Sequence, residues 1–142
     1  MAINPLTTLI QIIVVVSGAV FTFLMRRGGA EKILELSVLV LFGILGMILI
    51  ISANDLLMLY LGLELQSLTF FILAAIKRNG EFSTEAGLKY FILGAVSSGL
   101  FLLGCAYTYL VTGHTGYSAL SELSLAGLSS TFGAILILIA LL

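Results

Sequence analysis

Residues 56–76 read LLMLYLGLELQSLTFFILAAI, an apolar stretch with a single charged side chain, Glu64. An α-helix needs about 20 mostly apolar residues to cross the hydrocarbon of a bilayer. The stretch lacks the strict alternation of apolar and polar residues that is typical of transmembrane barrel strands. Backbone groups in lipid must be satisfied within a helix or a closed barrel. The stretch therefore predicts a transmembrane helix that carries a carboxylate inside the bilayer.

Other apolar stretches of similar length flank this one. The chain of 142 residues is 61% hydrophobic and 9% charged, whereas a soluble domain is about 25% charged. We therefore predict an all-α fold, a polytopic transmembrane helical bundle in contact with lipid, forming one domain over residues 1–142. Its five predicted spans are residues 7–25, 33–52, 56–76, 85–111 and 119–142. Because the last apolar run reaches Leu142 without a polar flank, we expect the bundle to need helices from another chain or segment.

Polar residues between the predicted spans indicate helix ends and orientation. Asn54 or Asp55 is expected to cap the third span, and Ser83 or Thr84 the fourth. Lysine and arginine gather in loops on the inner side of a membrane. Here they follow the first and third predicted spans, at Arg26, Arg27, Lys32, Lys77 and Arg78. The N-terminus is therefore expected outside, and both basic loops in the matrix or cytoplasm.

The composition excludes several function classes. A net charge of -1 gives no electrostatic footprint for nucleic acid. Cys105 is the only cysteine and His114 the only histidine, so no metal or iron–sulfur site is expected. We interpret Cys105 as a packing residue and His114 as a solvated loop residue. No nucleophile–base pair or phosphate-binding loop appears, so no catalytic residue is assigned.

Glu64 is the main candidate site residue. It lies 12 residues before Ile76, or about 18 Å at the helical rise. A carboxylate at that depth costs at least about 2.5 kcal/mol unless it is protonated, paired or hydrated. One interpretation is a group that gains and loses a proton, and the other is a structural hydrogen bond between helices. Tyr60 and Ser67 share its helix face and are expected to bond to it or to line a water path.

Lys89 is the second candidate, about one turn inside the fourth predicted span. Three interpretations remain open: its ammonium reaches the inner headgroups, pairs with Glu85 four residues earlier, or points toward the Glu64 region. Small residues follow Lys89 on the same span and predict close helix packing; they are Gly94, Ala95, Ser98 and Gly99.

Three stretches carry a resemblance to a known family. They are SANDLL at 52–57, LYLGLELQSL at 59–68 and FSTEAGLKYFILGA at 82–95. Together with their spacing, they resemble subunit 2 of respiratory complex I, NADH:ubiquinone oxidoreductase, over roughly residues 35–112. The resemblance implies an antiporter-like fold and a place in the membrane arm of a proton-pumping enzyme, with no redox chemistry in this chain. Glu64 and Lys89 match the charged residues of the family's proton path.

The same resemblance implies the surroundings of the chain. FMN, iron–sulfur clusters and ubiquinone would lie in other subunits. The partners would be other membrane-arm subunits. The rest of subunit 2, including the lysine that pairs with the glutamate, would be carried by a second polypeptide or, if this chain is truncated, by a missing segment. The location would be the mitochondrial inner membrane or, alternatively, a bacterial plasma membrane. Two rival hypotheses remain: a subunit of a multi-subunit cation/proton antiporter, and a membrane scaffold without transport.

Overall fold

The computed structural model describes residues 4–27, 33–75, 81–118 and 131–141, and most of them are helical. The helices are α1 (Pro5–Arg27), α2 (Ile33–Ile51), α3 (Leu56–Ala74), α4 (Glu81–Thr112) and α6 (Thr131–Leu141). The predicted all-α fold is confirmed. In the described part of the chain, the first four of these helices are long and apolar enough to cross a bilayer, whereas α6 has 11 residues.

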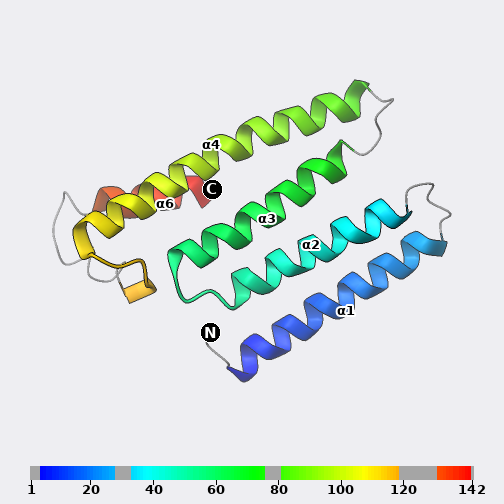
Figure 1. Ribbon diagram of the computed structural model, residues 1–142, viewed down its shortest axis with the longest axis horizontal. Coiled ribbons are helices and arrows are strands. Elements are labelled where there is room, and N and C mark those ends of the chain that lie inside the picture. The colour runs from blue at the N-terminus through cyan, green and yellow to red at the C-terminus, as the bar shows by residue number, and fades with distance from the viewer. Residues whose placement is uncertain (1–3, 28–32, 76–80, 119–130, 142) are drawn as a thin grey trace.

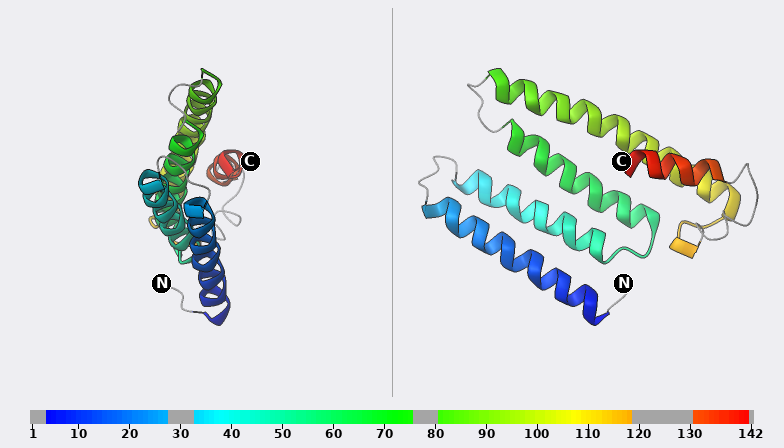
Figure 2. Two further views of the ribbon diagram at one scale, coloured as in Figure 1. Left: turned by 90° about the vertical axis from the view of Figure 1, so that its right-hand side faces the viewer. Right: turned by 180° about the vertical axis from the view of Figure 1, so that it is seen from behind.

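The first four helices lie side by side in chain order, and successive helices run in opposite directions (Figure 1). Figure 2 shows this row nearly edge-on, with α6 beside α4 and displaced from the row. Short connections between antiparallel neighbours account for the arrangement. The end of α1 and the end of α3 therefore lie at the same end of the bundle, and the turn between α2 and α3 lies at the other.

The turn between α2 and α3 is joined to the segment after α4 through Asp55. Asp55 is the N-cap of α3, as predicted, because its Oδ1 accepts a 2.7 Å hydrogen bond from Leu57 N. Its Oδ2 accepts another, of 2.7 Å, from Thr115 Oγ1. Leu56 N donates to the Thr115 carbonyl at 2.9 Å. Burial, and then the charge of Asp55, raise the pKa of the Tyr117 phenol above its ordinary value.

The prediction of a Ser83 or Thr84 cap on α4 is wrong. The helix begins at Glu81, four residues before the predicted start of this span. Ser83 Oγ instead donates to the Ala74 carbonyl at 2.6 Å, near the end of α3. The Ser83 hydroxyl therefore satisfies the last turn of the preceding helix, a use that sequence alone does not distinguish from an N-cap. Residues 119–130 of the predicted fifth span lie outside the described residues.

Glycines bring two pairs of helices into close contact. A Cβ added at Gly62 of α3 would meet the Gly46 carbonyl of α2 at 3.0 Å and Ile50 N at 3.0 Å. A Cβ added at Gly104 of α4 would meet the Gly133 carbonyl of α6 at 3.0 Å. Such close approach of backbones is typical of small-residue contacts between membrane helices.

The buried core lies where α3, α4 and α6 meet. It consists of Leu56, Phe101, Cys105 and Ile137, with Tyr60 packed against it. Cys105 is 2% exposed, in agreement with its interpretation as a packing residue. This core fixes the relative positions of the α3 and α4 side chains that are described next.

Candidate functional site

Glu64 lies near the middle of α3, eight residues after Leu56 and ten before Ala74. These separations are about 12 Å and about 15 Å at the helical rise. The Glu64 side chain is half-buried on the side of α3 that meets α4. A carboxyl group is therefore held far from both ends of a helix that is long enough to span a bilayer.

Ser98 of α4 joins two polar groups of α3. Its Oγ donates to Glu64 Oε1 at 3.0 Å, and it lies 3.1 Å from the Tyr60 hydroxyl. Tyr60 and Glu64 are four residues apart, so they share one face of α3. The result is a chain of three polar groups across the contact between the two helices.

The Tyr60 ring is held by stacking on Phe101, with centroids 5.9 Å apart and planes at 19°. Phe101 follows Ser98 by three residues, so both side chains lie on the face of α4 that meets α3. Phe101 is 3% exposed. The apolar core therefore fixes the phenol, whose hydroxyl is bonded to Ser98, and Ser98 in turn bonds to the carboxyl.

Lys89 pairs with Glu85 on its own helix, with Lys89 Nζ 2.5 Å from Glu85 Oε1. Their side chains are 71% and 57% exposed. This is one of the three arrangements left open by the sequence. Nine residues, or about 13.5 Å at the helical rise, separate Lys89 from Ser98 along α4. The Lys89 ammonium therefore lies near the beginning of α4, away from the carboxyl of Glu64.

Ser67 does not join the polar chain of Tyr60, Ser98 and Glu64. It lines a cavity of about 590 Å³ between α3, α4 and α6, together with Tyr90, Ser97 and Ala140. The Ser97 hydroxyl on this wall donates to the Ala140 carbonyl, which ties α4 to α6. Ser67, which was expected to share a helix face with Glu64, thus lines a neighbouring cavity instead of bonding directly to Glu64.

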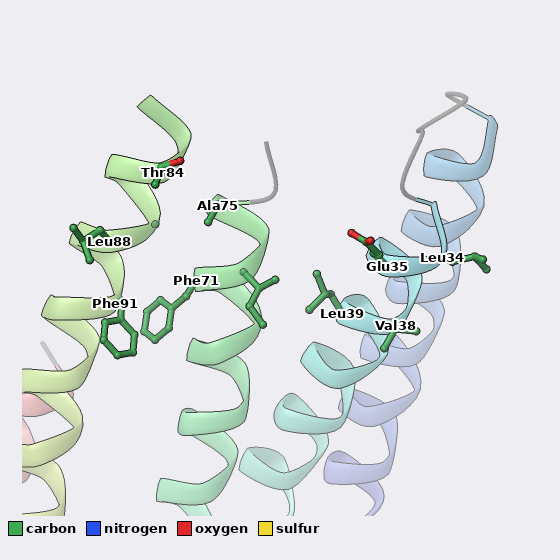
Figure 3. A pocket seen from close by; sticks show the side chains of 11 residues that line it. Leu34, Glu35, Val38, Leu39, Phe71, Ala75, Thr84, Leu88 and Phe91 are labelled. Carbon is green, nitrogen blue, oxygen red and sulfur yellow. The ribbon is translucent and has the colours of Figure 1, made fainter. Parts of the chain in front are cut away.

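A second groove, of about 820 Å³, lies between α2, α3 and α4 (Figure 3). Its wall is mainly apolar, and Phe71 and Phe91 meet edge to face with centroids 5.7 Å apart. Its polar side chains are Glu35 and Thr84. The groove contains neither Glu64 nor Ser98, so it is separate from the polar chain at the middle of the helices.

Two expectations about small and polar residues need correction. His114 is half-buried, not fully solvated, since it lies within the segment that Asp55 and Thr115 fasten to the α2–α3 turn. Gly99, expected to pack closely, has nothing within 4 Å of an added Cβ in the described residues. Gly94 does pack closely, beneath the Phe71 ring.

Sequence reasoning missed the role of Ser98, which was grouped with the small packing residues. Two successive hydroxyls, Ser97 and Ser98, in an apolar helix were the available signal. Periodicity alone does not show that one of them faces Glu64, because the rotation of α4 against α3 is fixed by the core.

The family model described as "NADH:quinone oxidoreductase/Mrp antiporter, TM" matches residues 53–142, more than half of the chain. This chain belongs to the NADH:quinone oxidoreductase/Mrp antiporter family. The matched region contains Tyr60, Glu64, Lys89 and Ser98, so the whole candidate site lies within the family's transmembrane segment.

Relatives in this family come from bacteria and from a mitochondrial lineage. NADH-quinone oxidoreductase subunit N 1 of Rhizobium meliloti is 42% identical over 97% of this chain and 30% of its own. NADH-ubiquinone oxidoreductase chain 2 of Marchantia polymorpha is 51% identical over 70% of this chain and 20% of its own. The chain therefore spans less than a third of the length of these relatives.

Chains in two solved respiratory membrane complexes match the helical arrangement of this chain. One match is a chain in the structure of respiratory complex I from Thermus thermophilus with bound aureothin. The match covers 99% of this chain and 32% of that chain, with a TM-score of 0.74 at 32% identity. Another match is a chain in the structure of an archaeal membrane-bound sulfane sulfur reductase complex. It covers 84% of this chain and 25% of that chain, with a TM-score of 0.73 at 29% identity. The helical row and α6 thus match part of a larger subunit in each complex.

Proposed function

We propose that this chain is a piece of a membrane-arm subunit of a proton-pumping NADH:quinone oxidoreductase, in which Glu64 belongs to the proton path. The observation that carries the proposal is a hydrogen-bonded carboxyl at the middle of a membrane-spanning helix. A titratable group at that depth is a functional candidate, because its charge is expensive there. The family membership and the relatives' names support the choice of complex.

The relatives favour this complex over a separate cation/proton antiporter. The family model covers both classes, but the relatives at 41–52% identity are named as NADH-quinone or NADH-ubiquinone oxidoreductase subunits. The antiporter remains the second candidate, and it predicts cation transport without NADH oxidation.

Glu64 would change its proton occupancy as charges elsewhere in the arm change during turnover. An electrostatic change at a distance acts on a site only if the two states of that site differ in charge, and a carboxyl meets this condition. Lys89 would act as a charge partner near the inner end of the path, with Glu85 restraining its ammonium. Tyr60 and Ser67 would line the path next to Glu64.

The remaining parts of the enzyme would come from other polypeptides. Iron–sulfur clusters need several thiolate ligands, and this sequence has one cysteine, so it does not fit such a cluster. Flavin and quinone chemistry is likewise assigned to other subunits. A second polypeptide would supply the rest of subunit 2. The membrane would be the mitochondrial inner membrane or a bacterial plasma membrane, with the N-terminus outside and the basic loops inside.

Replacing Glu64 with glutamine tests the role of the carboxyl. Glutamine keeps the size and a hydrogen-bond acceptor but cannot exchange a proton. We expect Glu64→Gln to reduce NADH-driven proton pumping per assembled complex by about a hundredfold, the effect of losing a proton-transfer group. The complex should still assemble, as measured on native gels.

The same variant separates a role of Glu64 in the proton path from the hypothesis of a membrane scaffold without transport. A scaffold predicts loss of assembly with normal pumping by whatever complex remains. Normal assembly together with normal pumping in Glu64→Gln contradicts the assigned role of Glu64.

A further inference from the structure

The Ser98 hydroxyl occupies a position from which it contacts both an acid and a phenol. It lies 3.0 Å from Glu64 Oε1 and 3.1 Å from the Tyr60 hydroxyl. A serine hydroxyl has one proton to donate and two lone pairs. It therefore donates to one of these partners while it accepts from the other.

The charge of Glu64 decides the direction of both hydrogen bonds. An ionised carboxylate only accepts, so Ser98 donates to Glu64 and accepts from Tyr60. A protonated Glu64 can donate to Ser98, which frees the Ser98 proton for the Tyr60 oxygen. The two bonds therefore reverse together when Glu64 gains a proton.

The surroundings hold this chain in one geometry. Tyr60 is stacked on Phe101, which is buried in the core between α3, α4 and α6. Tyr60 lies one helical turn from Glu64, on the side of the Asp55 cap. A change at Glu64 is therefore passed through Ser98 to the hydroxyl of a residue whose backbone lies about 6 Å nearer that end of the bundle.

We propose that Ser98 is a positioning residue that orients the Glu64 carboxyl toward α4 and couples its proton occupancy to the Tyr60 hydroxyl. The inference rests on the proposed function of Glu64 and adds two hydroxyls to it. The Ser98 hydroxyl can donate to the carboxylate and accept from the protonated acid, so it can hold the Glu64 carboxyl in place in both states. Loss of a hydrogen bond to a charged group changes the equilibrium between the bonded and unbonded arrangements by about tenfold or more.

The test uses Ser98→Ala, Tyr60→Phe and their double variant in the intact respiratory complex. Pumping is measured per assembled complex. Each single variant should pump about tenfold more slowly, and the double variant no worse than the slower single one, because the two hydroxyls act as one unit. Ser98→Thr keeps a hydroxyl and should restore pumping.

Ser52→Ala is the matched control. Ser52 is a buried serine just after α2, and its hydroxyl accepts from Gln11 Nε2 of α1 at 2.7 Å. Within the described residues no hydrogen bond joins this hydroxyl to a carboxyl. Its loss should leave pumping per assembled complex unchanged. A purely structural role of interhelical serines would give Ser52→Ala and Ser98→Ala the same effect, which would overturn the inference.

An infrared measurement reads the carboxyl directly. The carbonyl-stretch band of protonated Glu64 is identified by its absence in Glu64→Gln, and it should move to higher frequency in Ser98→Ala. An unmoved band, or normal pumping in Ser98→Ala while Glu64→Gln does not pump, refutes the role of Ser98 alone. Normal pumping in Glu64→Gln refutes the proposed function instead. If Ser98→Ala does not assemble, Tyr60→Phe decides by the same criteria, since it keeps the ring on Phe101.

Discussion

Glu64 is held by contacts that its own helix does not provide. Its partner is Ser98 of α4, whose position depends on Phe101 in the core and on the Tyr60 ring. A polar group in a bilayer is costly unless it is hydrogen-bonded or hydrated. The Ser98 hydroxyl reduces that cost and can bond to the carboxyl in either charge state, whereas a permanent ion pair would favour one charge state.

Lys89 offers a prediction at the same scale. Lys89 lies about 13.5 Å along α4 from Ser98, the partner of Glu64. Over a distance of that order, at an effective dielectric constant of about 20, one unit charge changes the energy of another by about 1 kcal/mol. Glu85 offsets part of this effect. Lys89→Gln should therefore slow pumping by up to about fivefold, measured per assembled complex.

The control for Lys89→Gln is a variant of Glu85, the ion-pair partner of Lys89. Exposed ion pairs contribute only about 0.2–1 kcal/mol, so breaking this one should hardly affect assembly. Glu85→Gln breaks the same pair but leaves the positive charge, and it should not slow pumping. An equal loss of pumping in both variants would mean that the pair acts only by fastening the first turns of α4.

The site residues were only partly predictable from sequence. Glu64 stands out because any charge inside an apolar stretch of 21 residues does. The four-residue spacing of Lys89 and Glu85 made their pairing one of three open interpretations, and the structure has that pair. Ser98 does not stand out, because a serine in a membrane helix serves packing or hydrogen bonding equally well, and only the rotation of α4 against α3 decides between them.

At the scale of the helices, backbone contact sets the spacing of α2 and α3. Gly46 and Gly62 face each other with no room for a side chain. Apolar periodicity predicted these helices with ends within about two residues of the observed ones. It failed at the beginning of α4, where Ser83 bonds back to α3 instead of capping its own helix.

Gly62→Ala tests the contact between α2 and α3. The new methyl would meet backbone atoms at 3.0 Å, which cannot move aside as a flexible side chain can. Overpacking of this kind costs about 1–3 kcal/mol. We expect a lower thermal unfolding midpoint for the detergent-solubilised complex, with less complex recovered from the membrane.

Gly99→Ala serves as the comparison for that helix contact. The described residues leave open space around Gly99, and alanine favours a helix over glycine by about 1 kcal/mol. The midpoint should stay the same or rise. A fall equal to that of Gly62→Ala would show that the open space at Gly99 is filled by another helix in the complex.

For the whole molecule, the main feature is a row of helices with extensive apolar surface. The described part of α1 contains no buried residue, and its main contacts among the described helices are with α2. The chain spans 20–30% of the length of its first relatives, and 25% and 32% of the two chains that it matches in solved complexes. Such a row is well suited to pack against further membrane helices, which is the basis for proposing a second polypeptide.

The most direct test of the account is to purify this chain, with an affinity tag, from its native membrane under mild detergent. The predicted result is a single large complex in which the tagged chain, a second subunit 2 polypeptide and NADH:quinone oxidoreductase activity migrate together on a native gel. Migration of the tagged chain with a sodium-transporting assembly that does not oxidise NADH would contradict the account.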